Sequence, residues 1–465
     1  MRRGHEEFRL LRGDVVVLMA PNHLDLCIPF YAALYVGVVT AAIDRTFGVS
    51  ELKRTFEVTQ PKLIFCQSAR APYVQQALKE LGSPAHIITF DNGDYTSFPE
   101  FLENFGQGAD IDKFSGTTGL PKNAAVTHKN LAINTPYFLS RSFDYPSPTK
   151  KSLLVSPLQW LTTLINFLLS AVLRFTRVQS SFEMTEEHTY HIINMYRPTF
   201  VIMSPTMMTL LLKPGHRDKC DFTCLELIML GGTAVSQSLL QDLKEVSPKA
   251  EVYDAYGASE LCTLVFNVDL QAPGSCGRPI GCFQYRLVDI TTQKDILVPH
   301  VPGELWVKGP GIFKGYYNNL AATKETFAEG GWFKTGDLFY RDNDWNFYFV
   351  DRAKLLLKYH NHQISPVEVE GVIRQHPGVL DVAVTGVPHP ECGDLPMACV
   401  VKKVGHSVTA QEIKKLVKDN LTETKQLRGG VIFLSEMPVT PSMKINRTKL
   451  KEIAIKMAKE KEQYV

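Results

Sequence analysis

The length and composition of the chain narrow the classes of protein to consider. Its 465 residues are too many for one ordinary hydrophobic core and predict two or three domains. Hydrophobic residues make up 45% and charged residues 21%, as in globular proteins, and a net charge of +2 argues against nucleic-acid binding and attraction to an anionic membrane. The 9 scattered cysteines predict neither a zinc site nor a disulfide framework. Reduced thiols in an intracellular compartment are therefore expected.

The N-terminal part alternates between apolar runs and helical patterns. Buried parallel strands are predicted from β-branched runs at residues 14–20, 38–43, 62–66 and 86–90. Helices are predicted at residues 29–37 and 73–81, whereas residues 92–113 have an irregular, acidic pattern. This alternation predicts a mostly parallel α/β sheet, in which ligands bind at the carboxyl ends of the strands.

Three further strands are predicted in the middle of the chain, at residues 200–203, 225–230 and 252–256. The second ends at Gly231-Gly232-Thr233, and glycine there lets a flat ring lie against the backbone. The third leads into Tyr256-Gly257-Ala258-Ser259-Glu260. Each junction taken alone is an ordinary connection between a strand and a turn.

An uncharged stretch, residues 153–173, is long enough to cross a bilayer. It contains Pro157, Gln159 and Asn166, however, and polar groups are costly in lipid. We therefore predict a buried core helix rather than a membrane span, and leave a membrane transporter as the alternative.

From Gly303 onward the pattern changes. Period-two alternation at residues 304–309 and 345–350 predicts antiparallel strands. After them we expect helices and strands at residues 367–374, 382–387, 398–401 and 410–419, and a solvated helix at 447–462. We place the boundary between an N-terminal domain, residues 1–350, and a C-terminal domain, residues 351–465, near Asp351. Within the larger domain, parallel α/β subdomains are expected to about residue 280 and a β-rich subdomain from about 281 to 350.

The most informative motif is Ser115-Gly116-Thr117-Thr118-Gly119-Leu120-Pro121-Lys122. Its glycines let backbone N–H groups approach an anion, and two hydroxyls and a lysine add further contacts. The motif thus predicts binding of nucleotide phosphates. It is neither a Walker A loop nor a Gly-x-Gly-x-x-Gly fingerprint, and a Gly-Thr-Thr-Gly sequence alone could equally be a polar surface turn.

Together with Thr127-His128-Lys129-Asn130, the octapeptide resembles the signature loop of the adenylate-forming superfamily of acyl-CoA synthetases, coumarate-CoA ligases and beetle luciferases. The similarity runs from about Gly13 to Leu450 and is greatest to insect luciferase-like acyl-CoA synthetases. It implies an α/β fold with a large AMP-binding domain and a small mobile α+β domain. The family usually has further residues before Gly13, so an incomplete N-terminal subdomain is expected.

The resemblance also implies an ATP site. The β- and γ-phosphates would be held by Ser115, Gly116, Thr117, Thr118, Gly119 and Lys122. The adenine and the α-phosphate would be contacted by Gly231, Gly232, Thr233, Tyr256, Gly257 and Ser259. In this assignment Tyr256 stacks on the adenine, Asp337 and Arg352 bind the ribose, and Glu260 helps to hold Mg²⁺.

The implied activity is a two-step ligation. A carboxylate attacks the α-phosphate of ATP and releases pyrophosphate, and the thiolate of coenzyme A then attacks the acyl-adenylate. Lys444 matches the catalytic lysine of the small domain, and Glu260 is the other catalytic group of this step. The domain would rotate between the steps about a hinge from Asp351 to Lys354, exchanging the parts that carry Lys358, a third catalytic position, and Gln363.

Several positions depart from the family pattern. Asn123, Asn361 and Met443 occur where glycine is usual, and Leu158-Gln159-Trp160 replaces a luciferase histidine pair. The stretch 158–167 is mostly apolar and favours a fatty or aromatic acid. The alternatives are a weak or inactive adenylate-binding relative and a light-emitting oxygenase.

The expected ligands are therefore ATP, Mg²⁺, coenzyme A and a carboxylic acid, with no nucleic acid. A monomer or weak dimer is expected. The expected location is cytoplasmic or peroxisomal, although the C-terminal residues Gln463-Tyr464-Val465 are not the Ser-Lys-Leu peroxisomal address.

Overall fold

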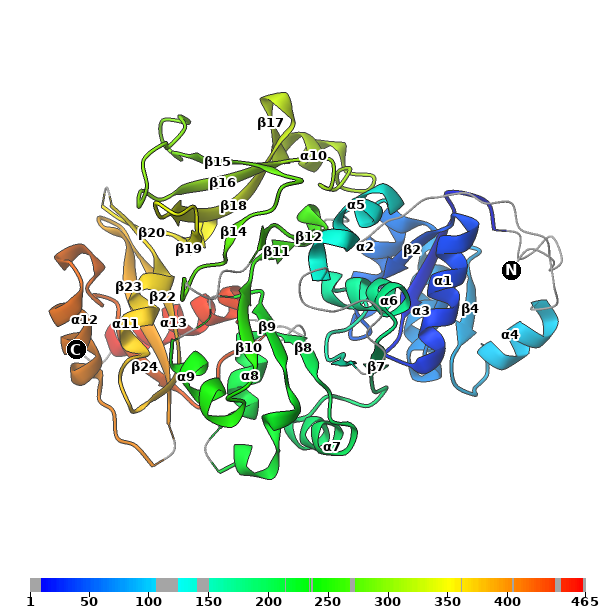
Figure 1. The fold of residues 1–465 in the computed structure, drawn as a ribbon, viewed down its shortest axis with the longest axis horizontal. Coiled ribbons are helices and arrows are strands. Elements are labelled where there is room, and N and C mark those ends of the chain that lie inside the picture. The colour runs from blue at the N-terminus through cyan, green and yellow to red at the C-terminus, as the bar shows by residue number, and fades with distance from the viewer. Residues whose placement is uncertain are drawn as a thin grey trace.

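The computed structural model has an α/β fold built from four main sheets (Figure 1). Its described residues are 10–105, 124–139, 150–213, 215–233, 235, 237–267, 272–360, 362–403, 405–439 and 445–462. Figure 1 shows the N-terminal sheet at the right, the second sheet at the lower centre, the third above it and the C-terminal part at the left. The octapeptide motif, Asn123, Asn361, Met443 and Lys444 lie outside the described residues.

The first sheet is parallel, with strand order β2-β1-β3-β4-β5. Its strands are β1 (Val15–Met19), β2 (Val39–Ala42), β3 (Pro61–Cys66), β4 (His86–Thr89) and β5 (Thr96–Ser97). Its helices are α1 (Cys27–Val36), α2 (Val49–Thr59), α3 (Ala71–Leu81) and α4 (Phe98–Phe105). The apolar side chains form two clusters, one including residues of α1 and α4 and the other including residues of α2 and α3. The predicted strands at 14–20, 38–43, 62–66 and 86–90 are confirmed.

The irregular structure predicted for residues 92–113 is partly wrong. A short strand, β5, and the helix α4 occupy residues 96–105. Phe98 and Phe101 are buried and pack edge-on against Phe65 of β3. Their spacing of three residues places both on one helical face, but the acidic neighbours mask this pattern in the sequence.

The second sheet is also parallel, with strand order β10-β9-β8-β6-β7. Its strands are β6 (Lys151–Leu153), β7 (Thr176–Val178), β8 (Phe200–Met203), β9 (Leu227–Gly231) and β10 (Glu251–Ala255). The helices of this part are α5 (His128–Leu139), α6 (Leu161–Leu173), α7 (Glu186–Tyr196), α8 (Pro205–Leu211) and α9 (Gln237–Val246). All three strands predicted for this region are confirmed to within two residues at each end.

The uncharged stretch 153–173 folds as the end of β6, a turn and the helix α6, so the predicted helix begins later than expected. One side of α6 packs on the second sheet, where Ile165 and Leu169 join the cluster of Phe200. Phe167 joins the cluster of the first sheet. Because α6 contacts two sheets, it is apolar around much of its circumference. Among the described residues, no helix is both long and apolar enough to span a membrane.

The third sheet is antiparallel, as the period-two patterns predict. It has the order β15-β16-β18-β17, and β19 pairs with β18. Its strands are β15 (Gln284–Val288), β16 (Gly303–Lys308), β17 (Phe327–Ala328), β18 (Trp332–Arg341) and β19 (Phe347–Arg352), and α10 (Leu320–Thr326) precedes β17. Two short hairpins, β11 (Gly257–Ala258) with β12 (Thr263–Leu264) and β13 (Phe266–Asn267) with β14 (Arg278–Pro279), lie between the second and third sheets in the chain.

The C-terminal part contains the fourth sheet, with order β21-β20-β23-β22 and with β24 paired to β23. Its elements are β20 (Leu357–Tyr359), β21 (His362–Ile364), α11 (Pro366–Ile373), β22 (Val379–His389), β23 (Gly393–Lys402), α12 (Ala410–Asn420), β24 (Gly430–Leu434) and α13 (Arg447–Glu462). The helix predicted at 447–462 forms, but it is not merely solvated. Leu450 and Ala454 are fully buried in a cluster with Met397.

Candidate active site

The carboxyl ends of β9 and β10 form the base of the site. Gly231 ends β9 and pairs with Ala255 at the end of β10. A Cβ atom at Gly231 would lie 2.7 Å from the carbonyl oxygen of Ala255, and Gly232 has a φ of +95°. Both positions therefore require glycine, the first for close backbone approach and the second for its left-handed backbone.

A cavity of about 310 Å³ opens at these strand ends. It extends from the start of α6 across β8 and β9 to the β11–β12 hairpin. It is lined by Gln159, Trp160, Leu161, Thr162, Ile165, Ile202, Met203, Met229, Gly231, Gly232, Ala255, Gly257, Ala258, Ser259, Thr263 and Leu264. None of these described side chains is ionisable. The apolar pocket predicted from residues 158–167 is thus present in part, whereas Leu158 and Phe167 belong to the first-sheet core.

The third sheet carries a buried carboxylate that contacts Tyr256, the residue after β10. Asp337 is 2% exposed and pairs with Arg352 in the register of β18 and β19. The hydroxyl of Tyr256 donates to Asp337 Oδ2 over 2.7 Å, and Arg352 Nε lies 3.0 Å from Oδ1. Burial raises the pKa of Asp337, and the guanidinium of Arg352 and the hydroxyl of Tyr256 oppose this rise.

The Asp337 carboxylate has unused hydrogen-bonding capacity. Apart from the ion pair with Arg352, no described group donates a hydrogen bond to the buried Oδ1. Buried acceptors of this kind normally have a partner. The remaining lone pairs of Oδ1 could accept hydrogen bonds from the ribose hydroxyls of a nucleotide, and this role stays a prediction.

Tyr256 is held by an aromatic cluster. Its ring centroid lies 4.7 Å from that of Phe339, edge to face, and 5.8 Å from that of Phe266. Burial, reinforced by Asp337, raises its pKa well above the ordinary range, so the hydroxyl remains a donor. Stacking of this ring on an adenine stays a prediction.

Glu260 lies in a short 3₁₀ turn, Ser259–Leu261, within the β11–β12 hairpin. Its Oε1 accepts a hydrogen bond of 2.8 Å from the hydroxyl of Tyr316. Among the residues that the structure describes, no group of three or more His, Cys, Asp or Glu side chains could hold a metal. A single carboxylate nevertheless fits Mg²⁺, which commonly binds one or two protein carboxylates together with substrate phosphates and water.

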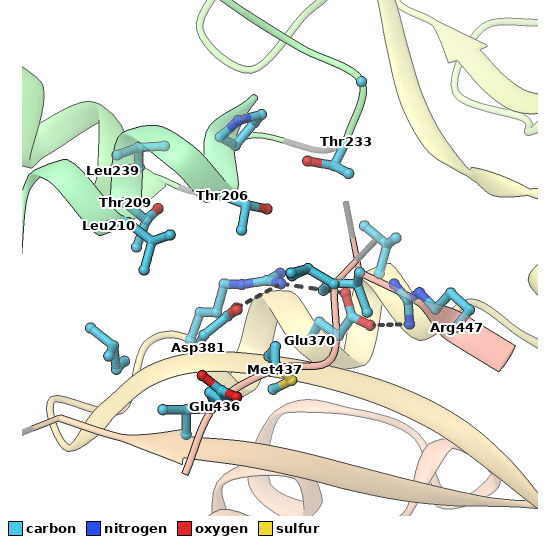
Figure 2. Close-up of a pocket in the computed structure, with 18 of the residues that line it drawn as sticks. Thr206, Thr209, Leu210, Thr233, Leu239, Glu370, Asp381, Glu436, Met437 and Arg447 are labelled. Atoms are coloured by element: carbon cyan, nitrogen blue, oxygen red, sulfur yellow. Dashed lines mark hydrogen bonds and ion pairs between the residues drawn. The ribbon is translucent and has the colours of Figure 1, made fainter. Parts of the chain in front are cut away.

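A second cavity, of about 450 Å³, separates the α8–α9 side of the second sheet from the C-terminal part. Figure 2 shows Thr206, Thr209 and Leu210 of α8 on one side and Glu370, Asp381 and Arg447 on the other. Gly232 lines both cavities, so they meet at the end of β9. Val439 and Ile445 also line the second cavity and form an antiparallel bridge.

Sequence reasoning missed a buried ionic network in this wall. Glu370, which is 2% exposed, lies 2.8 Å from Arg447 and 3.5 Å from Arg374, and Arg374 lies 3.8 Å from Asp381 (Figure 2). Glu370 and Arg447 are separated by much of the C-terminal part of the chain. The only available signal was the spacing of four residues between Glu370 and Arg374 on a predicted helix.

The structure does not bring all predicted residues together. Lys354, Lys358 and Gln363 are exposed, and Lys358 faces Gln363 across the β20–β21 hairpin, away from the linings of both cavities. By contrast, Thr233 and Arg352 line the second cavity and Ser259 lines the first. Gly257 is required in its hairpin, because a Cβ there would lie 2.7 Å from the carbonyl oxygen of Thr263.

Comparisons with known proteins identify the family of the chain. Residues 7–317 match the family described as AMP-binding enzyme, and residues 368–444 match the AMP-binding enzyme C-terminal domain. The chain is 31% identical to a luciferin 4-monooxygenase of Photuris pensylvanica, over 97% of this chain and 87% of that protein. It is 30% identical to 4-coumarate--CoA ligase-like 9 of Arabidopsis thaliana, over 96% of this chain and 81% of that protein.

Solved structures share the fold. An anthranilate CoA ligase in complex with anthranoyl-AMP has a TM-score of 0.88 at 20% identity, with 97% of this chain and 89% of that chain covered. An o-succinylbenzoate coenzyme A synthetase of Bacillus subtilis, in complex with ATP and a magnesium ion, has a TM-score of 0.78 at 22% identity, with 95% and 90% covered. The chain therefore belongs to the AMP-binding, adenylate-forming superfamily of enzymes.

Proposed function

We propose that this enzyme is an ATP-dependent acid–CoA ligase that activates a fatty or aromatic carboxylic acid. The observation that supports it most directly is the uncharged cavity at the ends of β8, β9 and β10, which is bounded by Gly232 and Ser259. In the proposed arrangement this cavity holds the body of the acid. Its carboxylate would then point toward the α-phosphate bound at Ser259.

In this proposal the nucleotide lies across the glycines that end β9. Gly231, Gly232 and Thr233 would border the adenine, with Tyr256 on its face and Gly257 beside it. Asp337 would accept hydrogen bonds from the ribose hydroxyls, supported by Arg352. The loop of Ser115, Gly116, Thr117, Thr118, Gly119 and Lys122 would bind the β- and γ-phosphates.

The first step joins two anions, so cations must offset their repulsion. Glu260 would hold Mg²⁺, which supplies positive charge at the phosphates when bound. Lys444 would supply charge between the acid and the α-phosphate. One carboxylate oxygen then forms a bond to the α-phosphorus, the bond to the bridging oxygen breaks, and pyrophosphate leaves.

In the second proposed step, the thiolate of coenzyme A attacks the acyl carbon and AMP leaves. The exposed Lys358 and Gln363 would approach the cleft only after the C-terminal domain rotates near Asp351, Arg352 and Lys354. The domain boundary near Asp351 is part of this proposal. Asp351 is buried and accepts hydrogen bonds from Ser365 and Val367 at the start of α11, so it links the third sheet to the C-terminal part.

The cavity lining also limits the acid. A second charged group on the substrate would lose its hydration without gaining an ionic partner among the described lining residues, at a cost of several kcal/mol. Dicarboxylic acids and amino acids are therefore poor candidates. Monocarboxylic acids with a fatty or aromatic body fit the lining.

An acid panel tests the proposal. The protein is incubated with fatty acids of increasing length, cinnamic acids and dicarboxylic controls, together with Mg·ATP and labelled pyrophosphate. We expect exchange of label into ATP with apolar monocarboxylic acids, and formation of the acyl-CoA when coenzyme A is added. Binding of ATP without exchange for any acid would contradict the ligase and favour the alternative, an inactive adenylate-binding relative. With luciferin we expect no light, because Gln159 and Trp160 replace the histidine pair.

A further inference from the structure

The segment 311–316 lies between α5 and the hairpin that carries Glu260, and it forms hydrogen bonds with both. Asn130 and Asn134 of α5 are 4% and 2% exposed. The side-chain amide of Asn130 donates to the carbonyl oxygen of Ile312 over 2.7 Å, and that of Asn134 donates to Gly311 over 3.0 Å. A Cβ at Gly311 would lie 2.2 Å from Asn134 Oδ1. This end of the segment is therefore fixed by buried amides.

The same segment joins the residues that follow the octapeptide motif. The N–H of Ala125 donates to the carbonyl oxygen of Gly315 over 2.8 Å, and the N–H of Lys314 donates back to Ala125 over 3.1 Å. The N–H of Phe313 donates to the backbone carbonyl of Glu260 over 2.8 Å. The segment thus contacts the backbones of both Ala125 and Glu260.

Tyr316 extends this arrangement to the side chain of Glu260. The residue is 8% exposed, and its ring centroid lies 5.0 Å from that of Phe313, edge to face. Its N–H donates to Thr323 Oγ1 over 2.8 Å, and Gly315, with a φ of +138°, lets Thr323 approach. Thr323 therefore holds the backbone of Tyr316 and Phe313 packs against its ring, while its hydroxyl donates to Glu260 Oε1.

We propose that Tyr316 is a positioning residue that fixes one carboxylate oxygen of Glu260 and so presents the other, Oε2, to the magnesium–nucleotide complex. No described residue donates a hydrogen bond to Oε2. This inference rests on the proposed function in one respect, namely that Glu260 is the magnesium ligand.

Tyr316 should strengthen metal binding because a glutamate side chain without a supporting partner can adopt several rotamers. A side chain that binds Mg²⁺ from one of several rotamers must lose that freedom on binding. A hydrogen bond from a buried phenol removes it beforehand. Removing such a supporting partner of a metal ligand typically weakens metal binding by about 10- to 100-fold.

The test compares Tyr316→Phe with the wild type. Mn²⁺ binding is titrated by electron paramagnetic resonance with ATP present and no acid, so that no turnover is needed. We expect the dissociation constant of Mn²⁺ to rise by about 10- to 100-fold. In pyrophosphate exchange, the Mg²⁺ concentration for half-maximal rate should rise similarly, while the rate at saturating Mg²⁺ changes little.

Tyr317→Phe is the matched control. Tyr317 is the adjacent residue and loses the same hydroxyl, but it packs against the first-sheet cluster. It should bind Mn²⁺ like the wild type. Thermal unfolding and ATP binding without metal check that Tyr316→Phe is folded.

The Mn²⁺ and ATP binding of Tyr316→Phe decide whether Tyr316 is a positioning residue. Unchanged Mn²⁺ affinity in Tyr316→Phe would overturn the proposal, and so would an equal loss of metal-free ATP binding, which indicates a purely structural role. A selective loss of metal affinity supports it. If the wild type binds Mn·ATP but exchanges no pyrophosphate with any acid, the ligase proposal fails, while the binding comparison still decides the role of Tyr316.

Discussion

Asp337 shows how the site depends on single side chains from distant positions. Tyr256, at the end of the second sheet, and Arg352, near the proposed hinge, both converge on its carboxylate. Burial raises the pKa of Asp337, and both partners oppose that rise. The proposed ribose contact and the proposed domain boundary are therefore coupled through one residue.

The ionisation of a second residue, Asp254, should make the stability of the protein depend on pH. Burial raises the pKa of this carboxyl from 3.8 to about 7. The folded protein therefore binds more protons here than the unfolded chain between about pH 4 and 7, and the stability falls as pH rises through that window. Above about pH 7 the free-energy cost of keeping the ionised Asp254 carboxylate buried is constant, and below about pH 4 this cost is absent because the carboxyl is protonated in both states.

Replacing Asp254 with asparagine should remove this cost. We expect Asp254→Asn to increase the free energy of unfolding relative to the wild type by about 1–4 kcal/mol at pH 8, and by less at pH 5. Urea denaturation at the two pH values measures the difference. An equal effect at both would show that Asp254 does not titrate in this window.

At the scale of elements, the buried pair of Glu370 and Arg447 joins α11 to α13. Arg447 also donates to the carbonyl oxygen of Val384 in β22 over 2.9 Å, and Glu370 accepts from the N–H of the same residue over 2.8 Å. The start of α13 is thus tied to both a helix and a strand. This contact fixes the chain just beyond Lys444.

Removing one partner of the Glu370–Arg447 pair should destabilise the folded protein. Arg447→Met leaves the Glu370 carboxylate buried without its main partner, so the free energy of unfolding should fall by about 3–5 kcal/mol. Chemical denaturation measures the loss. Lys449→Met, at an exposed position on the same helix, should change it little. The double variant Glu370→Leu with Arg447→Met should recover much of the stability, and failure to do so would contradict an ionic explanation.

At the scale of the whole molecule, the two proposed steps, adenylation and thioester formation, would each use a different orientation of the C-terminal domain. Val439 and Ile445 line the second cavity, while Lys358 and Gln363 are exposed and lie outside its lining. If Lys444 serves only the first step, the two half-reactions should respond differently to its loss.

We expect Lys444→Ala to lower pyrophosphate exchange by about 10²- to 10⁴-fold, the range for losing one strong transition-state contact. Formation of acyl-CoA from a supplied acyl-adenylate should change little, because that step needs no attack on the α-phosphate. Both half-reactions are measured on the same preparation, with Lys449→Ala as the control. An equal loss in both would show that Lys444 does not act in the first step alone.

The sequence by itself determined the family, the order of the motifs and most of the strands and helices. These features depend on local patterns: β-branched runs at 14–20 and 200–203, period-two alternation at 304–309, and glycines whose backbone geometry no other residue can replace. Local patterns indicate whether each segment prefers a helix, a strand or a turn, and most described segments of this chain adopt the structure that their pattern favours.

Only the tertiary structure decided which side chains meet. The burial of α13, the helix α4, the pair of Glu370 and Arg447 and the hydrogen bond from Tyr316 to Glu260 join segments far apart in the chain. Such contacts depend on how sheets and helices pack, and many packings satisfy the same local pattern. That is why the candidate residues could be named from the sequence, whereas the groups that hold them in place could not.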